Sequence, residues 1–501
     1  MNQAASGARR RAWLAFAFAP VSGAASVLAF APFEWRWFAP AALAALFVLA
    51  WSARGRRAFA LGYGFGLGQF GAGVSWVVVS VDQFGNVGTP LAVVITAAFV
   101  ALLAVFPALA LWLGARAAPG ASRVVAFAGA WLLIEWLRGW ALTGFPWLSL
   151  GYSQVDAGLA GLAPVGGVYL IGLALAFAAA ALAGALRERS VVYVTLLLGA
   201  ALVWPAAHFS ARMQWTQPVD GPFRVAAVQG AIAQEQKWLP TQRWKTLALY
   251  SRLSRDAGAA DLVVWPETAV PAFFESVADE WLRPLAAELA GQGTTLVVGV
   301  PYEPGREYFN ALVSFAGGGE QVYAKRHLVP FGEYLPFDAW LRPLLTWLEI
   351  PMSRFSAGPD EPPLLDVGRY QAAASICYED AFGRETRAAL PQARFLLNAS
   401  NDAWFGDSLA PHQHLEIARM RSLETGRWML RATNTGISAV IDADGRVSVR
   451  SPQFAEHVLI ADLQPRAGAT PYVRFGDWPA VLIALVSFLF GRPWRRTHSA
   501  Q

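Results

Sequence analysis

The first part of the chain alternates long apolar runs with short polar breaks, and this pattern ends near Pro218. Most of the apolar runs approach the roughly 20 residues that a helix needs to cross the hydrocarbon core of a bilayer. They predict seven helices, at about residues 12–31, 37–53, 58–80, 88–115, 123–143, 164–186 and 190–208. We therefore expect an N-terminal membrane domain over residues 1–210 with about seven transmembrane helices.

A last apolar run extends from Trp478 to Phe490. It is short, and its length also suits a helix that lies at the membrane interface. Three arginines follow it, namely Arg492, Arg495 and Arg496. We expect a C-terminal transmembrane helix with a basic cytoplasmic tail within residues 472–501.

Arginines concentrate in alternate breaks between the apolar runs. They are Arg9, Arg10, Arg11, Arg54, Arg56, Arg57, Arg116, Arg123, Arg187 and Arg189, whereas the opposite breaks hold little besides Arg36 and Arg138. Because positively charged loops stay on the cytoplasmic side, we expect the N-terminus inside and residue 218 outside. A cleaved signal peptide is the alternative interpretation of the first run, but six further spans favour a retained helix.

Residues 218–468 read as an α/β domain between these apolar parts. Its short runs are rich in Val, Leu and Ala and mostly lack polar alternation, which is typical of strands covered on both faces. The predicted strands lie at 223–230, 261–267, 295–301, 310–315, 372–378 and 393–400, with helix-like stretches at 241–258 and 411–428.

Composition narrows the class of protein. The chain has 501 residues, of which 55% are hydrophobic and only 15% charged, against about 25% charged in a typical soluble domain. Its 22 Trp and 31 Phe suit bilayer interfaces. The net charge is only +5 without a basic block, so we expect no nucleic-acid partner. The single cysteine excludes an intrachain disulfide and a cysteine-based metal cluster.

Three residues at the ends of predicted strands could carry chemistry. Cys377 ends an apolar strand, Lys325 follows another, and Glu267 follows DLVVWP at the carboxyl end of a third. Singly, each has an ordinary interpretation: a buried small hydrophobe, a solvated lysine and a loop carboxylate. Together they suit nucleophilic catalysis, because open α/β sheets usually place their sites at strand ends.

Other polar pairs are less informative. His412 and His414 are two residues apart, on different faces of a helix, and no acidic or cysteine cluster completes a site, so we predict no metal and no cofactor. Glu135 and Arg138 share a helix face within or near a span. Intramembrane charges are often functional, but a structural ion pair explains these two equally well.

The motifs around the three candidates resemble the nitrilase, or carbon–nitrogen hydrolase, superfamily. They are WPE at 265–267, the lysine of AKRHLVPFGEY and the cysteine of ICYE. The longer forms, together with LLNASNDAWFGD at 396–407, RATNTGISAVIDADGR at 431–446 and the layout of apolar helices, are similar to the apolipoprotein N-acyltransferases. The resemblance implies a multi-span α-helical membrane domain and an α-β-β-α sandwich domain with a Glu–Lys–Cys site.

The resemblance also implies an activity. Cys377 would take an acyl chain from a membrane phospholipid as a thioester and pass it to the α-amino group of a diacylglyceryl-Cys at the N-terminus of an apolipoprotein. Glu267 would move the protons, and Lys325 would stabilise the oxyanion. The expected location is the bacterial inner membrane, with the catalytic domain of residues 218–468 on its periplasmic face.

The same resemblance assigns supporting residues. Glu333, Tyr378 and Glu379 match positions that support the site, although Glu333 could instead pair with Arg326. Trp238 resembles a position near the acyl-binding entrance, and ordinary packing explains it equally well.

Two other functions remain open from the residues alone. The same triad could hydrolyse an amide or nitrile with water as acceptor, or the chain could be a transporter whose outer domain binds without chemistry. The apolar segment 337–352 could dip into lipid and gate entry, or pack as a hydrophobic subdomain.

Overall fold

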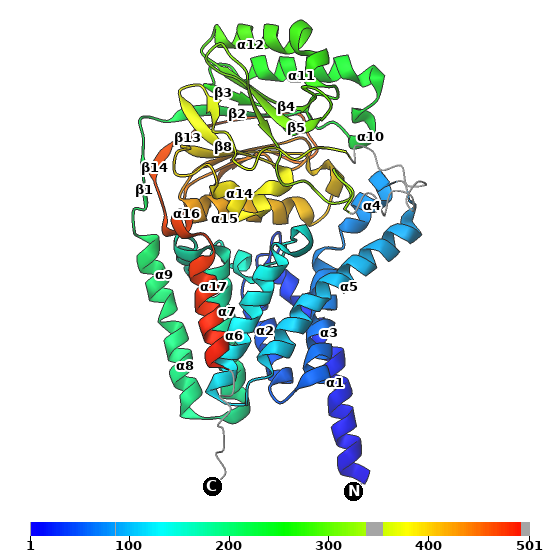
Figure 1. Cartoon of the computed structure of the whole chain (residues 1–501), viewed down its shortest axis with the longest axis vertical. Coiled ribbons are helices and arrows are strands. Elements are labelled where there is room, and N and C mark those ends of the chain that lie inside the picture. The colour runs from blue at the N-terminus through cyan, green and yellow to red at the C-terminus, as the bar shows by residue number, and fades with distance from the viewer. Residues whose placement is uncertain (1, 86, 337–353, 492–501) are drawn as a thin grey trace. The chain divides into compact units, whose positions relative to one another are not determined.

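The computed structural model describes residues 2–85, 87–336 and 354–491, and its chain separates into two compact units (Figure 1). The helical unit comprises the residues up to Ser75, Val93–Met213 and the residues from Asp477 on. The α/β unit comprises Trp76–Ala92 and Gln214–Gly476. Segment 337–352 and the arginines after residue 491, both singled out from the sequence, lie outside the described residues.

Every apolar run predicted in the N-terminal part contains helix. The helices are α1 (Asn2–Ser26), α2 (Phe38–Ala50), α3 (Gly55–Gly73), α4 (Val77–Gly85), α5 (Thr89–Gly114), α6 (Ala121–Arg138), α7 (Ala163–Glu188), α8 (Val191–Ala201), α9 (Val203–Ala211) and, near the C-terminus, α17 (Trp478–Phe490). The continuous helix expected at 58–80 is wrong, because α3 ends at Gly73 and the chain bends by 57° before α4. Glycine and serine near this break have low helix propensity.

Length and composition single out some helices as able to cross a membrane. Within the described residues three qualify: Thr89–Gly114, Gly158–Glu188 and Val191–Ala211. The bent pair Gly55–Gly73 with Val77–Gln83 would make a fourth. The apolar helices Leu14–Ala29, Phe38–Ala50 and Trp478–Phe490 are shorter. The expected seven N-terminal crossings and one C-terminal crossing stay a prediction.

Small residues let the first and third helices approach closely. A Cβ atom added to Gly23 on α1 would lie 1.9 Å from the carbonyl oxygen of Phe65, and one added to Gly68 on α3 would lie 1.9 Å from that of Pro20. Glycine is therefore required at both positions. Such backbone proximity is a usual way to pack helices in a bilayer, where burial of apolar surface drives association little.

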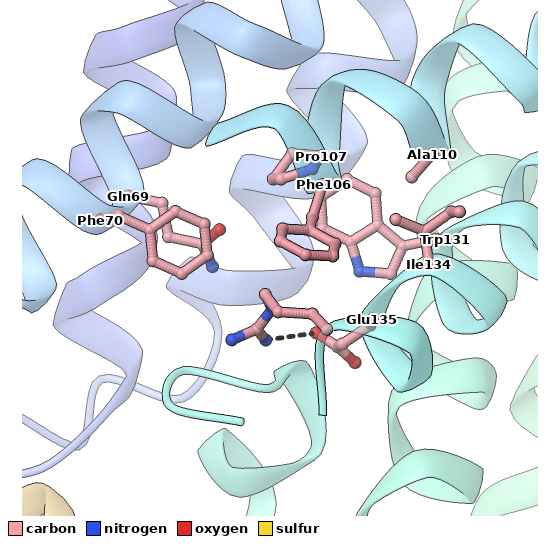
Figure 2. A pocket seen from close by; sticks show the side chains of 9 residues that line it. Gln69, Phe70, Phe106, Pro107, Ala110, Trp131, Ile134 and Glu135 are labelled. Carbon is pink, nitrogen blue, oxygen red and sulfur yellow. Dashed lines mark ion pairs between the residues drawn. The ribbon is translucent and has the colours of Figure 1, made fainter. Parts of the chain in front are cut away.

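The Glu135–Arg138 pair holds a loop of the helical unit. Arg138 at the end of α6 donates hydrogen bonds to the carbonyl oxygens of Phe145 and Trp147, at 2.5 and 2.6 Å. Glu135 accepts one from the backbone N–H of Leu150 at 2.9 Å, and the two side chains lie 3.8 Å apart (Figure 2). These contacts support the structural account of the pair, as the anchor of residues 145–150.

The α/β unit contains two six-stranded sheets. Their orders are β13-β2-β3-β4-β5-β6 and β12-β11-β10-β9-β8-β7, with β1 and β14 forming a separate pair. The strands are β1 (Thr216–Pro218), β2 (Phe223–Gln229), β3 (Leu262–Val264), β4 (Thr295–Tyr302), β5 (Phe309–Phe315), β6 (Gln321–Ala324), β7 (Leu365–Val367), β8 (Tyr370–Ile376), β9 (Phe395–Ser400), β10 (Met429–Thr433), β11 (Ala439–Ile441), β12 (Val447–Arg450), β13 (His457–Leu463) and β14 (Arg466–Gly468). In each sheet three neighbouring strands, β2-β3-β4 and β8-β9-β10, are parallel.

Helices cover the outer face of each sheet (Figure 1). Besides α4, the described helices of this unit are α10 (Gln234–Lys237), α11 (Arg243–Asp256), α12 (Arg283–Ala290), α14 (Gly383–Arg387), α15 (Ala410–Thr425) and α16 (Pro471–Phe475). Alternate residues of β2 divide between two cores, since Val225 packs between the sheets and Ala226 packs against α11 and α12. Leu396 of β9 packs toward α15. The expected α-β-β-α sandwich is thus confirmed.

The segment with α4 packs within the α/β unit, which the sequence did not indicate. The hydroxyl of Ser80 donates to the carbonyl oxygen of Trp404 at 2.6 Å, and the indole N–H of Trp76 donates to Gln413 at 3.2 Å. The ring of Trp76 also packs edge-on against Phe405. This segment therefore holds the short helix η9 (Asp402–Phe405), which follows β9.

Candidate active site

Glu267 lies just beyond the carboxyl end of β3 and is almost fully buried. The strand ends at Val264, two residues before Pro266, which has no N–H for a sheet hydrogen bond. Its Oε1 accepts a hydrogen bond from the amide of Asn310 at 2.7 Å, and its Oε2 accepts one from the backbone N–H of Asn401 at 2.9 Å. The carboxylate is thus held from both sheets.

Lys325 follows β6 and points its ammonium at two carboxylates. Its Nζ lies 3.3 Å from Glu267 and 2.9 Å from Glu333, with 1% of the side chain exposed. Burial alone would lower the pKa of this lysine, but Glu333 and Glu267 outweigh burial and raise it above its ordinary value. Lys325 therefore remains charged in the physiological pH range.

Cys377 stands at a sharp turn between β8 and the short helix η8 (Cys377–Ala381). Its φ of +51° is uncommon for a residue with a side chain and costs on the order of 1–3 kcal/mol. This turn aims the side chain from a strand end, as a nucleophile requires. Burial and the charge of Glu267 raise the pKa of the Cys377 thiol, while Lys325 lowers it. The net shift is upward, so the resting thiol is protonated.

Glu379 ties the cysteine turn to the lysine loop. One of its oxygens accepts hydrogen bonds from the backbone N–H groups of Arg326 and His327, at 2.6 and 3.0 Å. The other accepts from the N–H of Ile376 at 2.7 Å and the hydroxyl of Tyr323 at 2.9 Å. Burial raises the pKa of Glu379 to about 7 although these hydrogen bonds favour its charged form. The residues beside Lys325 and Cys377 are therefore fixed through one carboxylate.

Glu333 contacts Lys325 and not Arg326, whose guanidinium instead lies 3.0 Å from Glu385. The other carboxylate oxygen of Glu333 accepts a hydrogen bond from the backbone N–H of Val329 at 2.8 Å. The same Asn310 amide that binds Glu267 also donates to Glu333 at 2.8 Å. The structure thus brings four of the predicted site residues, Glu267, Lys325, Glu333 and Cys377, to one end of the sandwich.

Tyr378, which follows Cys377 in the chain, packs among aromatic rings, and Trp238 follows the short helix α10. The ring of Tyr378 packs edge-on against Phe382, with centroids 4.9 Å apart, and lies 5.8 Å from the ring of His327. Trp238 is 39% exposed at the end of α10. A side chain this exposed does more than pack inside the protein, so ordinary packing does not fully explain Trp238.

Several polar residues of the site were not predicted from the sequence. Asn310 and Asn401 orient Glu267, and Lys237 donates to the hydroxyl of Thr268 at 2.7 Å and toward the carbonyl oxygen of Glu267 at 3.4 Å. Burial lowers the pKa of Lys237 to about 8, although Glu267 opposes this shift. Asn310 begins a predicted strand, and Asn401 lies in the motif LLNASNDAWFGD. Both are polar residues at the ends of apolar strands, and this is the sequence feature that could have identified them.

From the sequence, His414 was considered only as a possible metal ligand. In the structure its ring nitrogens lie 2.8 Å from Asp380 and 2.9 Å from Asp402. Within residues 2–85, 87–336 and 354–491, no group of three or more His, Cys, Asp and Glu side chains is arranged to hold a metal ion. His414 belongs to a buried ionic network instead.

Two family models match the chain. The carbon–nitrogen hydrolase model matches residues 224–472, and the model of the apolipoprotein N-acyltransferase N-terminal domain matches residues 22–181. An apolipoprotein N-acyltransferase of Methylococcus capsulatus is 48% identical over 482 residues, which cover 94% of this chain and 95% of that protein. The chain belongs to the apolipoprotein N-acyltransferase family.

Other members of this family give the same result. Apolipoprotein N-acyltransferases of Pseudomonas syringae and Pseudomonas aeruginosa are 42% and 41% identical, each over 96% of both chains. The chain is therefore an acyltransferase with a nitrilase-like domain. Its apolar helices fit a membrane protein.

Proposed function

We propose that this acyltransferase moves a fatty acyl chain from a membrane phospholipid to the N-terminal diacylglyceryl-Cys of apolipoproteins in the bacterial inner membrane. The main support is the convergence of buried Glu267 and Lys325 beside Cys377, the chain's single cysteine. This combination of a carboxylate, an ammonium and a thiol suits transfer of an acyl group through a covalent intermediate. The names of the curated relatives supply the acceptor class.

In the first half-reaction Cys377 attacks the ester carbonyl of the phospholipid. Because the pKa of its thiol is raised, a base must remove the proton, and Glu267 is suited to accept it. The sulfur–carbon bond forms, and the negative charge on the former carbonyl oxygen is stabilised by Lys325 and by the backbone N–H that follows Cys377. The carbon–oxygen bond then breaks, and the departing lysophospholipid oxygen takes the proton from Glu267.

In the second half-reaction the α-amino group of the acceptor cysteine attacks the thioester. Glu267 accepts a proton from the amine as the nitrogen–carbon bond forms, and the Cys377 sulfur leaves and recovers a proton. One carboxylate serves both steps because the same proton is taken and returned in each. Two successive transfers through one thioester predict ping-pong kinetics.

The remaining assignments belong to this proposal. The membrane domain spans residues 1–210, the catalytic domain of residues 218–468 lies on the periplasmic face, and residues 472–501 form the last span and a cytoplasmic tail. Glu333, Tyr378 and Glu379 support the site. Trp238 contacts the acyl substrate, and its exposure at the end of α10 supports that contact.

The test is intact mass spectrometry of the purified full chain after incubation with phospholipid alone. The proposal expects a mass increase of one acyl group in the wild type and none in Cys377→Ala. Addition of a diacylglyceryl peptide should discharge the adduct and acylate the peptide amine. Free fatty acid without acylated peptide would favour hydrolysis, and full function of Cys377→Ala would favour binding or transport.

A further inference from the structure

Four charged side chains are buried behind the Cys377 turn, and they come from four different elements. They are Asp380 in η8, Asp402 in η9, His414 in α15 and Arg431 in β10, and we call them the buried ion cluster. Arg431 lies 2.9 Å from Asp380 and 3.1 Å from Asp402, and His414 bridges the same two carboxylates.

The hydrogen bonds of His414 define the charge of the cluster. Its Nε2 lies 2.8 Å from Asp380 and its Nδ1 lies 2.9 Å from Asp402, so both ring nitrogens must carry a proton to donate. Arg431 also lies 2.9 Å from Nδ1, but two carboxylates bind a cationic ring more strongly than one guanidinium repels it. Burial and Arg431 lower the pKa of His414, yet Asp380 and Asp402 raise it to about 9. Two cations thus balance two anions.

Two polar side chains of β9 connect this cluster to Cys377. The amide of Asn398 donates to the carbonyl oxygen of Cys377 at 3.3 Å, and its own oxygen accepts from Arg431 at 2.7 Å. Ser400 donates to Asp402 at 3.0 Å. The parallel register of β8 and β9 pairs the residues just before Cys377 and Ser400, so these two stand side by side. Burial raises the pKa of the Cys377 thiol, and the Ser400 hydroxyl, whose single proton is directed at Asp402 in the resting protein, lowers it in part.

We infer that the buried ion cluster positions the Cys377 nucleophile and holds the Ser400 hydroxyl beside it, so that this hydroxyl turns its proton from Asp402 to the thiolate when the thiol ionises. The cluster reaches both sides of the nucleophile, since Asp380 belongs to the turn that Cys377 begins and Asp402 holds Ser400. Buried ion pairs contribute little net stability compared with apolar packing, so stability alone is a weak account of four buried charges here. Their neutrality also matters, because a net negative cluster would oppose formation of the thiolate.

The inference rests on Cys377 as the nucleophile, and its test does not require acyl transfer. Because the chain has one cysteine, the mass that iodoacetamide adds to the proteolytic peptide containing residue Cys377 reports on this thiol. The rate is measured on full-length protein between pH 7 and 10, together with the thermal midpoint. The charged groups that act on this thiol are Glu267, Lys325, Asp402 and, from β10, Arg431. The acyl adduct formed by the wild type tests the proposed function separately.

The decisive variant is His414→Gln, with His412→Gln on the same helix as its matched control. His414→Gln leaves the cluster with a net negative charge, so alkylation at pH 8 should slow by about tenfold, the equivalent of one pKa unit. His412→Gln should alkylate at the wild-type rate. A folded His414→Gln protein with a lower thermal midpoint but normal alkylation across the pH range would overturn the inference.

A second variant, Ser400→Ala, tests the same link even if His414→Gln does not fold. It removes a single hydroxyl between Asp402 and the thiol, and it should slow alkylation by about tenfold, as expected for loss of a hydrogen bond to a charged group. Normal alkylation of Ser400→Ala would overturn the role of this link in stabilising the thiolate. Slow alkylation at a wild-type thermal midpoint would support it, because a merely structural role would change the midpoint and not the reactivity.

Discussion

The Nζ atom of Lys325 lies 2.9 Å from Oε1 of Glu333, so the ammonium has a carboxylate partner other than the proposed base. Glu267 lies somewhat farther from it, at 3.3 Å. When Glu267 accepts a proton it loses its negative charge, and Glu333 then remains to keep the ammonium charged and in place. Two carboxylates around one lysine thus allow one of them to titrate during the reaction.

Replacement of Glu333 by Gln should slow formation of the acyl-enzyme by about 10- to 100-fold. The variant loses a hydrogen bond between charged groups, which is worth roughly 1.5–3 kcal/mol. The rate of the acyl mass increase after addition of phospholipid measures the effect. Glu361→Gln, an exposed position, serves as the control and should keep the wild-type rate. Equal rates for both variants would show that Glu333 is not needed by Lys325.

Glu267→Gln should separate the reactivity of the thiol from catalysis. Loss of a general base should reduce acyl-enzyme formation by about 10²- to 10⁴-fold. The negative charge of Glu267 raises the pKa of the Cys377 thiol, so its removal should accelerate alkylation by iodoacetamide at pH 8. Glu235→Gln, exposed on α10, should change neither rate. A slower alkylation in Glu267→Gln would contradict the electrostatic part of this account.

Lys237 should make the stability of the protein depend on pH. Its pKa is lowered to about 8 in the fold, from 10.5, so below pH 8 folding carries the cost of a buried charge. Between pH 8 and 10.5 the unfolded chain binds the extra proton, and stability therefore rises with pH. The wild type should gain thermal stability relative to Lys237→Met between pH 7 and 10, whereas Lys245→Met, an exposed control, should follow the wild type. A constant difference between wild type and Lys237→Met would refute this assignment.

Arg138→Met should destabilise the helical unit. The substitution removes the donor to the carbonyl oxygens of Phe145 and Trp147 and leaves buried Glu135 without its cationic neighbour. Breaking a buried pair in this way typically costs about 3–5 kcal/mol. The thermal midpoint in detergent should fall clearly, while Arg187→Met, at an exposed position, should leave it unchanged. An unchanged midpoint in Arg138→Met would mean that the loop is held by other contacts.

Burial explains which strands could be predicted from the sequence. The strands β2, β4, β8 and β9 are buried along most of their length, so their apolar runs were visible. By contrast, β12 alternates partly buried and exposed residues over only four positions, and β10 contains the charged but fully buried Arg431. A charge that is compensated only by distant residues breaks the apolar pattern that identifies a strand.

The same limit applies to the site. Glu267, Lys325 and Cys377 stand beside strand ends that the sequence marks, and their motifs identify them as candidates. Asn401 and His414 could not be assigned in this way, because their roles depend on partners more than thirty residues away in sequence or on another element. Such pairings arise only when the two sheets and their covering helices are assembled.

The packing of α4 has a consequence for the order of folding. Ser80 and the residue that it holds, Trp404, are 324 positions apart in the chain. At synthesis rates of about 5–20 residues per second, the partner of α4 emerges roughly 16 to 65 s after α4 itself. During this interval Trp76 and Ser80 cannot make their native contacts, and the N-terminal helices must be inserted without them. The α/β unit is thus completed by a piece of chain that was made long before the rest of it.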